Sequence, residues 1–379
     1  MHVNGNVKRD VAVDGVEGSA GGPAAEAGVR NRAVHQSGQR SGQRSGLRWL
    51  ILFTFTLATI HFARCYVMLT GYWIHLDTYA AGVEKMPFQG RMLMMWPLRW
   101  AERSGLLVRF TAHRLGALKS PELLVMTATA IVSLGATGWI VNRMYRETSR
   151  RRLFPWLPYA LLLAIAFVQF ILHSEQNFLY PYDLPSLLFF TAGAWLIYDK
   201  RLGEKRFWYL LLLFPVATLN RETTMFLIPL LLLDACCEEG RLRWRNALRP
   251  GVLAQAGVLS GIWVAIQMYV RHRFRNNPTD MGSHFGVNVV YLTHPQYWPQ
   301  LLSIGGFLPL FLLYFVKDIP DFRLRMYCWL FPVWLVAMSF FGMLVETRIF
   351  GELSGLMALV GALIFEEVAW RRVEGLRVR

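Results

Sequence analysis

Charged residues are scarce in this chain: Asp, Glu, Lys and Arg together make up 17% of its 379 residues, against 54% apolar residues. A soluble domain carries roughly 25% charged residues, so an ordinary soluble protein is excluded. The apolar residues gather in blocks of about 18–23, the length that a bilayer core about 30 Å thick requires. The sequence therefore predicts an all-α polytopic integral membrane protein.

Cysteine is also rare, and nothing in its spacing suggests a disulfide framework or a metal site. Each of the four lies in or beside an apolar block, where we interpret it as a packing residue: Cys65, Cys236, Cys237 and Cys328. His284 and His294 stand ten residues apart without a third ligand nearby. No cofactor is predicted, although the pattern leaves a divalent cation possible.

Acidic residues are outnumbered, with 25 Asp and Glu against 40 Lys and Arg. The basic residues concentrate in short loops between apolar blocks, as membrane topology and anionic headgroups favour. We therefore expect membrane lipids, and no nucleic acid, as partners. Residues 1–46 have too little apolar surface to fold and predict a disordered cytoplasmic tail. Residues 47–372 would form the membrane domain, and 373–379 a second cytoplasmic tail.

The apolar blocks predict about ten transmembrane helices, of which the fourth, fifth and sixth are short for a crossing. Their expected ranges are 48–69, 121–142, 153–172, 184–198, 207–220, 224–237, 251–270, 299–316, 326–345 and 350–368. Between the first two, residues 89–117 mix apolar residues with five Arg. An eleventh span would bury those Arg in hydrocarbon, so we expect amphipathic interfacial helices in the first outer loop.

Alternate loops fix the expected orientation. Lys and Arg concentrate in 143–152, 199–206, 238–249 and 317–325, which the positive-inside rule places in the cytoplasm. The long loops 70–120 and 271–298 also contain Arg but can translocate because of their length. The pattern predicts a multi-pass plasma-membrane protein with an even number of spans and both termini cytoplasmic.

This topology places nearly all of the unusual polar residues at the outer face. Ionisable groups at span ends cost free energy unless they pair or line a wet cavity. Each of these polar residues also has a purely structural explanation. Some charges could form ion pairs between helix ends, Arg64 could snorkel to the headgroups, and Asp77 and Asp183 could cap helices. Convergence on one face favours a functional site instead, formed by five groups: Arg64 with Asp77; Glu84 with Arg91; Asp183; Arg221 with Glu222; and Glu346 with Arg348.

Carboxylates and arginines at an outer membrane boundary suit a reaction on a polyprenyl-phosphate-linked sugar. A carboxylate can accept the proton of the incoming hydroxyl. Guanidinium groups can hold the departing phosphate by charge-assisted, often bidentate, hydrogen bonds. Because the leaving group is already a phosphate, a single base suffices for inversion at the anomeric carbon.

Over residues 48–368 the layout resembles that of the GT-C superfamily of membrane glycosyltransferases: one span, an outer loop with an acid and amphipathic helices, then many short-looped spans. Three segments are also similar to those of uncharacterised bacterial membrane proteins grouped near that superfamily: Pro87-Phe-Gln-Gly-Arg-Met-Leu, Asn220-Arg-Glu-Thr and Glu346-Thr-Arg-Ile-Phe-Gly-Glu. The resemblance implies sugar transfer from a lipid-linked donor at the outer face. It also implies that the first-loop acid, Asp77, is the catalytic base.

On this hypothesis the arginines of the three segments bind the phosphate or the donor: Arg91, Arg221 and Arg348. Glu222, Glu346 and Asp183 orient them, and Arg64 and Glu84 complete the substrate-binding set. Two alternatives remain open. A transporter or flippase of lipid-linked glycans predicts polar residues at mid-membrane and an internal repeat. A non-catalytic membrane assembly protein predicts an exposed apolar groove without convergent carboxylates.

Overall fold

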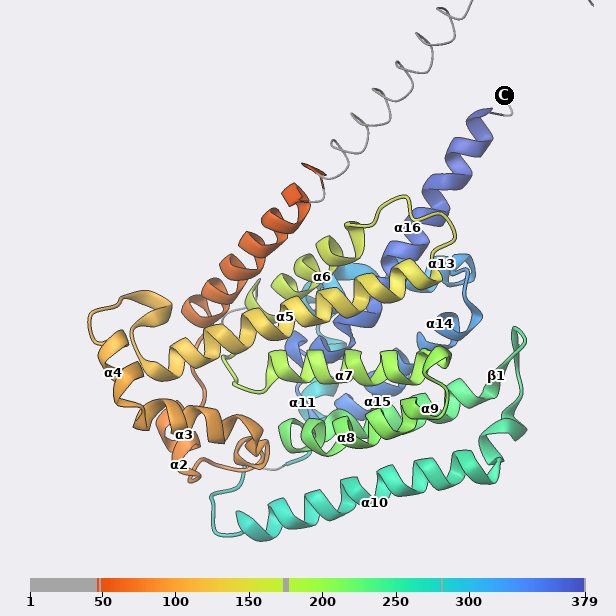
Figure 1. Ribbon diagram of the computed structural model, residues 1–379. Helices are drawn as coiled ribbons and strands as arrows, with labels where there is room; N and C mark the ends of the chain where they lie inside the picture. The colour runs from red at the N-terminus through yellow and green to blue at the C-terminus, as the bar shows by residue number, and fades with distance from the viewer. Residues whose placement is uncertain (1–45, 48, 173–176, 281, 378–379) are drawn as a thin grey trace, which may run out of the picture. The chain divides into compact units, whose positions relative to one another are not determined.

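The computed structural model describes residues 46–377, except 48, 173–176 and 281 (Figure 1). Contacts divide the chain into two units, Met1–Phe53 and Thr54–Arg379. In the first unit the described residues are helical, and the expected tail lies outside them up to residue 45. The second unit contains every feature discussed below.

The fold is all-α, as predicted. After a first helix over Trp49–Leu69, the α-helices are α2 Leu76–Ala81, α3 Met95–Arg103, α4 Gly105–Thr111, α5 Pro121–Thr148, α6 Leu157–Phe167, α7 Asp183–Tyr198, α8 Lys205–Asn220, α9 Leu227–Cys236, α10 Pro250–Arg273, α11 Phe285–Thr293, α12 Trp298–Leu302, α13 Leu308–Phe315, α14 Phe322–Tyr327, α15 Leu330–Phe341 and α16 Ser354–Arg377. A small hairpin, β1 Cys237–Glu238 with β2 Arg241–Leu242, occupies the loop after α9.

Short 3₁₀ segments connect these helices: η1 Phe88–Gly90, η2 Met92–Met94, η3 Gly116–Leu118, η5 Lys200–Leu202, η6 Glu222–Phe226, η7 Trp244–Leu248, η8 Pro295–Tyr297, η9 Ile304–Phe307, η10 Val316–Asp318 and η11 Thr347–Leu353. The segment η4, Val168–Leu172, is a π-helix that continues α6. Local sequence explains the best-defined start. Ser120 caps α5 by accepting a hydrogen bond from the Leu123 amide, and Pro121 supplies the first helical residue.

The expected count of ten spans is not supported. Five helices are long and apolar enough to cross a membrane: Trp49–Leu69, Pro121–Thr148, Pro250–Arg273, Phe322–Phe341 and Thr347–Glu374. The apolar blocks at 153–172, 184–198, 207–220 and 224–237 form helices of 16 residues or fewer. At 1.5 Å per residue, such helices reach about 24 Å, less than a bilayer core about 30 Å thick.

The block expected at 299–316 is a bent pair of helices. Pro295–Leu302 and Ile304–Asp318 meet at 77°, and the pair makes a sixth candidate if it is one span. Gly305, Gly306 and Phe307 all have positive φ at the bend. The two glycines tolerate this conformation because they lack a Cβ, so the chain turns there instead of continuing the helix.

The second unit has a buried central helix and exposed outer ones. In the most apolar 18-residue stretch of Thr347–Glu374, 94% of the residues are buried. In the corresponding stretch of Pro250–Arg273, only 11% are buried. The central helix α16 packs against α5, α6 and α7, while α10 covers α8 and α9 (Figure 1). Helix α10 therefore presents most of its apolar surface outward, as a lipid-facing helix does.

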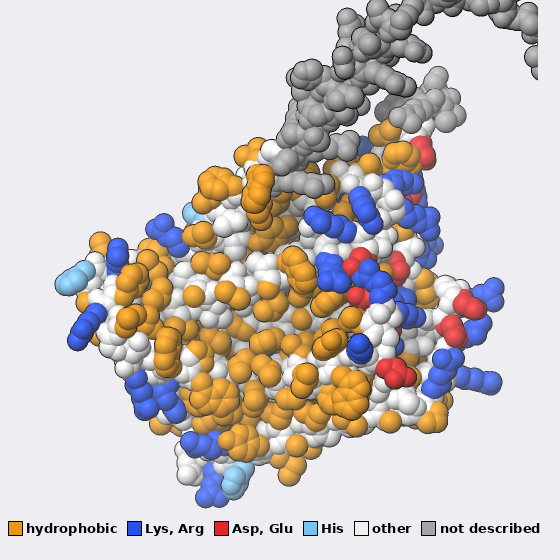
Figure 2. Space-filling model, in the orientation of Figure 1, with side chains coloured by type: hydrophobic (Ala, Val, Ile, Leu, Met, Phe, Trp, Pro, Cys, Tyr) orange, Lys and Arg blue, Asp and Glu red, His pale blue; other side chains and the backbone are white. Residues whose placement is uncertain are grey.

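Figure 2 shows a broad band of apolar side chains across the visible face, with charged side chains gathered at its ends. The residues expected to be interfacial form α3 and α4 with their connecting turns. Trp96, Trp100 and Leu106 are exposed there, while Met95 and Leu98 are buried. This distribution suits helices that pack on the protein with one face and contact lipid headgroups with the other.

Candidate functional site

Six of the nine residues predicted for the site meet at one end of α7 and α8. Asp183 is the first residue of α7, and Arg221 and Glu222 join α8 to η6. Arg91 lies between η1 and η2, and Glu346 and Arg348 lie at the start of η11. Segments more than 250 residues apart in sequence thus form one cluster, which we call the arginine cluster: Arg91, Asp183, Arg221, Glu222, Glu346, Arg348 and the additional Glu352.

Asp183 bridges two of the arginines. Its Oδ1 lies 3.2 Å from Nη1 of Arg221, and its Oδ2 lies 3.5 Å from Nη1 of Arg348. Arg348 also donates to the Glu346 carboxylate. All of these side chains are buried, and buried charges persist only when they are paired and hydrogen-bonded. Asp183 therefore holds the ends of α8 and η11 against the start of α7.

Arg91 and Glu222 form the accessible edge of the arginine cluster. Arg91 donates from both Nε, at 2.9 Å, and Nη2 to the two Glu222 carboxylate oxygens. The Glu222 side chain is 36% exposed and that of Arg91 is 11% exposed. Burial raises the pKa of Glu222, but the charge and hydrogen bonds of Arg91 have a larger, opposite effect. The net result is a pKa of about 2, below the ordinary 4.5. Glu222 is therefore a carboxylate at neutral pH.

Two tyrosines place their rings against the guanidinium groups. The Arg348 guanidinium lies 3.9 Å from the ring centroid of Tyr180. Those of Arg91 and Arg221 lie 4.6 and 6.0 Å from the ring centroid of Tyr182. Both distances to Tyr182 fit cation–π contacts. Tyr182 thus lies against two of the three arginines, and its neighbour Tyr180 lies against the third.

An aromatic row connects this point with the protein surface. Trp73, half exposed, lies 5.2 Å from Phe178, measured between ring centroids. Phe178 lies 6.5 Å from Tyr180, which lies 5.3 Å from Tyr182. Such spacings are typical of interacting aromatic pairs. The row leads from an exposed tryptophan to the arginines.

Several members of the site were missing from the predicted set. Glu352 lies 3.3 Å from Nε of Arg221 and accepts a hydrogen bond of 2.5 Å from Thr223. Its position one turn beyond Arg348 in the same segment is a signal that could have found it. Tyr180 and Tyr182 directly precede Asp183, so their proximity to it could also have been read from the sequence.

The π-helix η4 has no such signal. It leaves the carbonyl of Gln169 available, and that oxygen accepts hydrogen bonds from Asn177 at 2.8 Å and from Thr347 at 3.1 Å. These bonds fix the start of η11 beside α6. Single π-helical turns occur often at functional sites, but their position depends on tertiary contacts. Residues 173–176, which follow η4, lie outside the described residues.

The arginine cluster contains buried polar atoms that no described residue satisfies. They include Oη of Tyr182, Nε of Arg221, Nε of Arg348, Oδ1 of Asn220 and both side-chain polar atoms of Gln169. Buried polar groups are hydrogen-bonded in the great majority of cases. Of these atoms, Nε of Arg221 lies 3.3 Å from the Glu352 carboxylate without forming a hydrogen bond. The Nε–H group of Arg348 and the Tyr182 hydroxyl therefore retain the capacity to bind an oxygen-rich ligand or water.

The three other predicted residues lie outside the arginine cluster. Asp77 is exposed on α2, two residues from buried Tyr79, whose hydroxyl donates to the Arg91 carbonyl. Asp77 lines a separate cavity of about 350 Å³ with His75, Lys119 and Glu122. Side chains two residues apart on a helix point to nearly opposite sides. Asp77 therefore faces away from the contact that Tyr79 makes with Arg91.

Glu84 and Arg64 have other surroundings. The Glu84 carboxylate accepts hydrogen bonds from the His75 amide and the Thr78 hydroxyl, at 3.3 and 2.6 Å. It therefore stabilises the start of α2. Arg64 is exposed on the first helix, and the described residues offer it no ion pair. Neither residue contacts the arginine cluster.

Buried charges are not confined to one face, which corrects the expectation from the sequence. Asp234, near the end of α9, is buried and accepts hydrogen bonds of 2.7 Å from both Nε of Arg323 and the Tyr327 hydroxyl. Arg323 also donates to the Tyr198 carbonyl, at 2.8 Å, at the opposite end of α7 from Asp183. The loop 317–325, which was expected to be cytoplasmic and rich in Lys and Arg, thus contributes Arg323 to a second buried ionic network, because helix ends on that side also need polar partners.

Within the described part of the chain, no three His, Cys, Asp or Glu side chains are grouped so that they could hold a metal ion. The four cysteines are free thiols. Comparison of the chain with protein-family models, curated proteins and solved structures yields no match.

Proposed function

We propose that this protein is a membrane glycosyltransferase that takes a sugar from a polyprenyl-phosphate-linked donor, with the donor phosphate bound at the arginine cluster. The observation that carries the proposal is the arrangement of three guanidinium groups against Tyr180 and Tyr182, with an N–H of Arg348 and the Tyr182 hydroxyl making no hydrogen bond. A phosphate supplies the oxygen acceptors that these donors lack.

The charge balance requires an exchange of partners. Four carboxyl groups face three guanidinium groups, and each guanidinium already pairs with at least one of them. An entering phosphate must therefore displace a carboxylate. Glu222 is the one placed to leave, because it is the most exposed of the four and its carboxylate is hydrogen-bonded, among the described residues, to Arg91 alone. The phosphate would replace the Glu222 carboxylate as the acceptor of the hydrogen bonds from Nε and Nη2 of Arg91.

The displaced Glu222 carboxylate then acts as the base. The acceptor hydroxyl attacks the anomeric carbon, and its proton passes to Glu222. The bond from that carbon to the phosphate oxygen breaks, and the electron pair leaves with the phosphate, which the arginines stabilise. Without Arg91 beside it, the pKa of Glu222 returns towards the ordinary value near 4.5, so Glu222 becomes a better base when the donor is bound.

The lipid part of the donor has a suitable path. The aromatic row from Trp73 to Tyr182 offers faces for isoprenoid units or a sugar ring, and the exposed apolar residues of α3 and α4 continue it along the interface. On the positive-inside argument this end faces outward. The proposed compartment is therefore the outer leaflet of a bacterial inner membrane, with both termini cytoplasmic.

Transfer of radiolabelled sugar from a polyprenyl-phosphate donor by the purified full-length protein tests the proposal. Arg91→Gln should lower turnover by about 10²–10³-fold, the usual effect of removing one preorganised group that stabilises the charge of the transition state. Glu222→Gln should lower turnover while retaining donor binding. Asp77→Asn separates the two candidate bases: loss of turnover there with an active Glu222→Gln protein would return the role to Asp77.

A matched control is Arg143→Gln. Arg143 lies near the C-terminal end of α5, outside the arginine cluster, and its side chain pairs with Glu147. Turnover should be unaffected by that change. Equal activity of wild type and Arg91→Gln, with both proteins folded, would overturn the proposal.

One observation favours a transporter or flippase instead. The bent pair around Gly305 resembles the discontinuous helices that line transport sites. Movement of an intact fluorescent lipid-linked glycan across liposomes, without cleavage of the donor, would support that alternative. Neither transfer nor transport by folded protein would favour the assembly role.

A further inference from the structure

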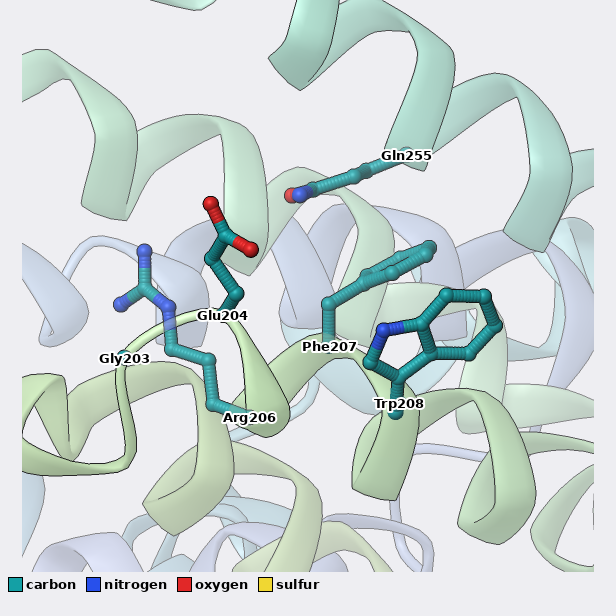
Figure 3. A pocket seen from close by; sticks show the side chains of 6 residues that line it. All are labelled: Gly203, Glu204, Arg206, Phe207, Trp208 and Gln255. Atoms are coloured by element: carbon teal, nitrogen blue, oxygen red, sulfur yellow. The ribbon is translucent and has the colours of Figure 1, made fainter.

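A second cavity lies at the opposite end of α8 from the arginine cluster. It has a volume of about 350 Å³ and is lined by Gly203, Glu204, Arg206, Phe207, Trp208 and Gln255 (Figure 3). Because α8 has 16 residues, the cavity and the cluster are about 24 Å apart along the helix. The cavity is therefore independent of the proposed reaction.

The cavity holds charges of both signs side by side. Glu204 and Arg206 flank the start of α8, and Gln255 reaches from α10 towards the Glu204 carboxylate (Figure 3). Arg206 uses Nη1 to donate to the Ile197 carbonyl at 3.1 Å, and the same atom lies 3.9 Å from Asp234. The described residues provide no hydrogen bond for its remaining N–H groups, for Glu204 or for Gln255. The cavity thus offers a guanidinium group that can bind an anion, from Arg206. It also offers two side chains whose oxygens can bind a cation, Glu204 and Gln255.

The surroundings of the cavity place it at a membrane boundary. Trp208 is 63% exposed, as interfacial tryptophans are, and Phe207 provides an apolar wall. Two lysines are close in sequence to the lining: Lys200 lies in η5, and Lys205 is the first residue of α8. A ligand here would have an apolar part in the bilayer and a polar part that carries both charges.

We propose that this cavity binds the headgroup of an aminophospholipid. The guanidinium of Arg206 would contact its phosphate. Glu204 and the Gln255 carbonyl oxygen would accept hydrogen bonds from its primary ammonium. A choline headgroup has no N–H to donate, and a glycerol headgroup has no positive charge for Glu204. The site therefore discriminates by the ammonium group and not by the phosphate.

Native mass spectrometry of the full-length protein can measure binding of phosphatidylethanolamine, phosphatidylcholine and phosphatidylglycerol from defined mixed micelles. Wild type should bind the ethanolamine lipid about tenfold more tightly than the choline lipid, as loss of one hydrogen bond to a charged group predicts. Glu204→Gln should remove this preference. Gln255→Leu should weaken it.

The matched control is Glu239→Gln, an exposed carboxylate of the β1–β2 turn that lies outside the cavity. This variant should keep the wild-type preference. Glu204 makes no hydrogen bond to any described residue, so its variant is expected to fold, which thermal unfolding can check. Equal binding of ethanolamine and choline lipids, or an unchanged preference in Glu204→Gln, would overturn the proposal. Tightest binding of the glycerol lipid would show a generic basic surface instead.

Discussion

The two ends of α7 carry buried ionic networks that differ in how completely they are satisfied. At the Tyr198 end, the Asp234 carboxylate accepts hydrogen bonds from Arg323 and Tyr327. Arg323 also donates hydrogen bonds to the carbonyls of Ile197 and Tyr198. Arginine at a helix C-terminus is a common structural device, because it satisfies carbonyls that have no partner within the helix. At the Asp183 end, the arginines contact carboxylates and tyrosine faces, and the Nε–H group of Arg348 and the Tyr182 hydroxyl make no hydrogen bond to a described residue.

The difference teaches that a buried charge at a span end is weak evidence for function. Both networks are buried, and both join helices distant in sequence. Only the arginine cluster combines unsatisfied donors with an exposed edge at Glu222. Unsatisfied hydrogen-bonding capacity, and not charge itself, distinguishes a candidate binding site from a structural clasp.

The largest expected effect lies at the structural end. Asp234→Ala should reduce the free energy of unfolding by about 3–5 kcal/mol, because it leaves Arg323 buried without its partner. Denaturant titration in detergent micelles measures the change. Donor binding by the fraction that remains folded should match wild type. A loss of less than about 1 kcal/mol would show that Asp234 does not hold this end together.

A matched pair of hydroxyl deletions sharpens the contrast. Tyr327→Phe removes the hydrogen bond to Asp234 and should cost about 1.5–3 kcal/mol, as expected for a bond to a charged group. Tyr182→Phe removes a buried hydroxyl with no partner among the described residues. It should leave the free energy of unfolding unchanged or slightly higher. Equal destabilisation by the two changes would erase the distinction between the networks.

The smallest effect concerns pH. Because the folded-state pKa of Glu222 is about 2, below the ordinary 4.5, the Arg91–Glu222 pair stabilises the protein fully above pH 4.5. That stabilisation declines as the pH falls through about 2. The difference in unfolding temperature between wild type and Glu222→Gln should be constant from about pH 7 to 5 and shrink only below that range. Shrinkage already near pH 6 would mean that Arg91 does not hold Glu222 ionised.

The arginine cluster was predictable because its members are polar residues at the ends of apolar blocks, where a charge needs a partner. Arg91, Arg221 and Arg348 were identified for that reason. The same argument grouped Asp77 and Glu84 with the arginines, but these two residues lie outside the arginine cluster, because their positions depend on how one long loop folds. Sequence indicates that an acid lies in that loop but not which side of α2 it faces.

The number of spans was not predictable for a related reason. An apolar block of 14–16 residues, such as 207–220, has the same composition whether it crosses a membrane or packs as a short buried helix. The bend at Gly305 and the π-helix η4 likewise arise from tertiary contacts. Helix type and apolar character were readable from the sequence, whereas helix length and continuity required the three-dimensional packing.

The most direct test of the central claim is the affinity of the full-length protein in nanodiscs for polyprenyl phosphate, measured for wild type, Tyr182→Phe and Tyr327→Phe. If the donors around Tyr182 bind the phosphate, Tyr182→Phe should weaken binding about tenfold without loss of stability. Tyr327→Phe should lose stability and keep its affinity. Unchanged affinity in a folded Tyr182→Phe protein, or no measurable binding by wild type, would contradict the account.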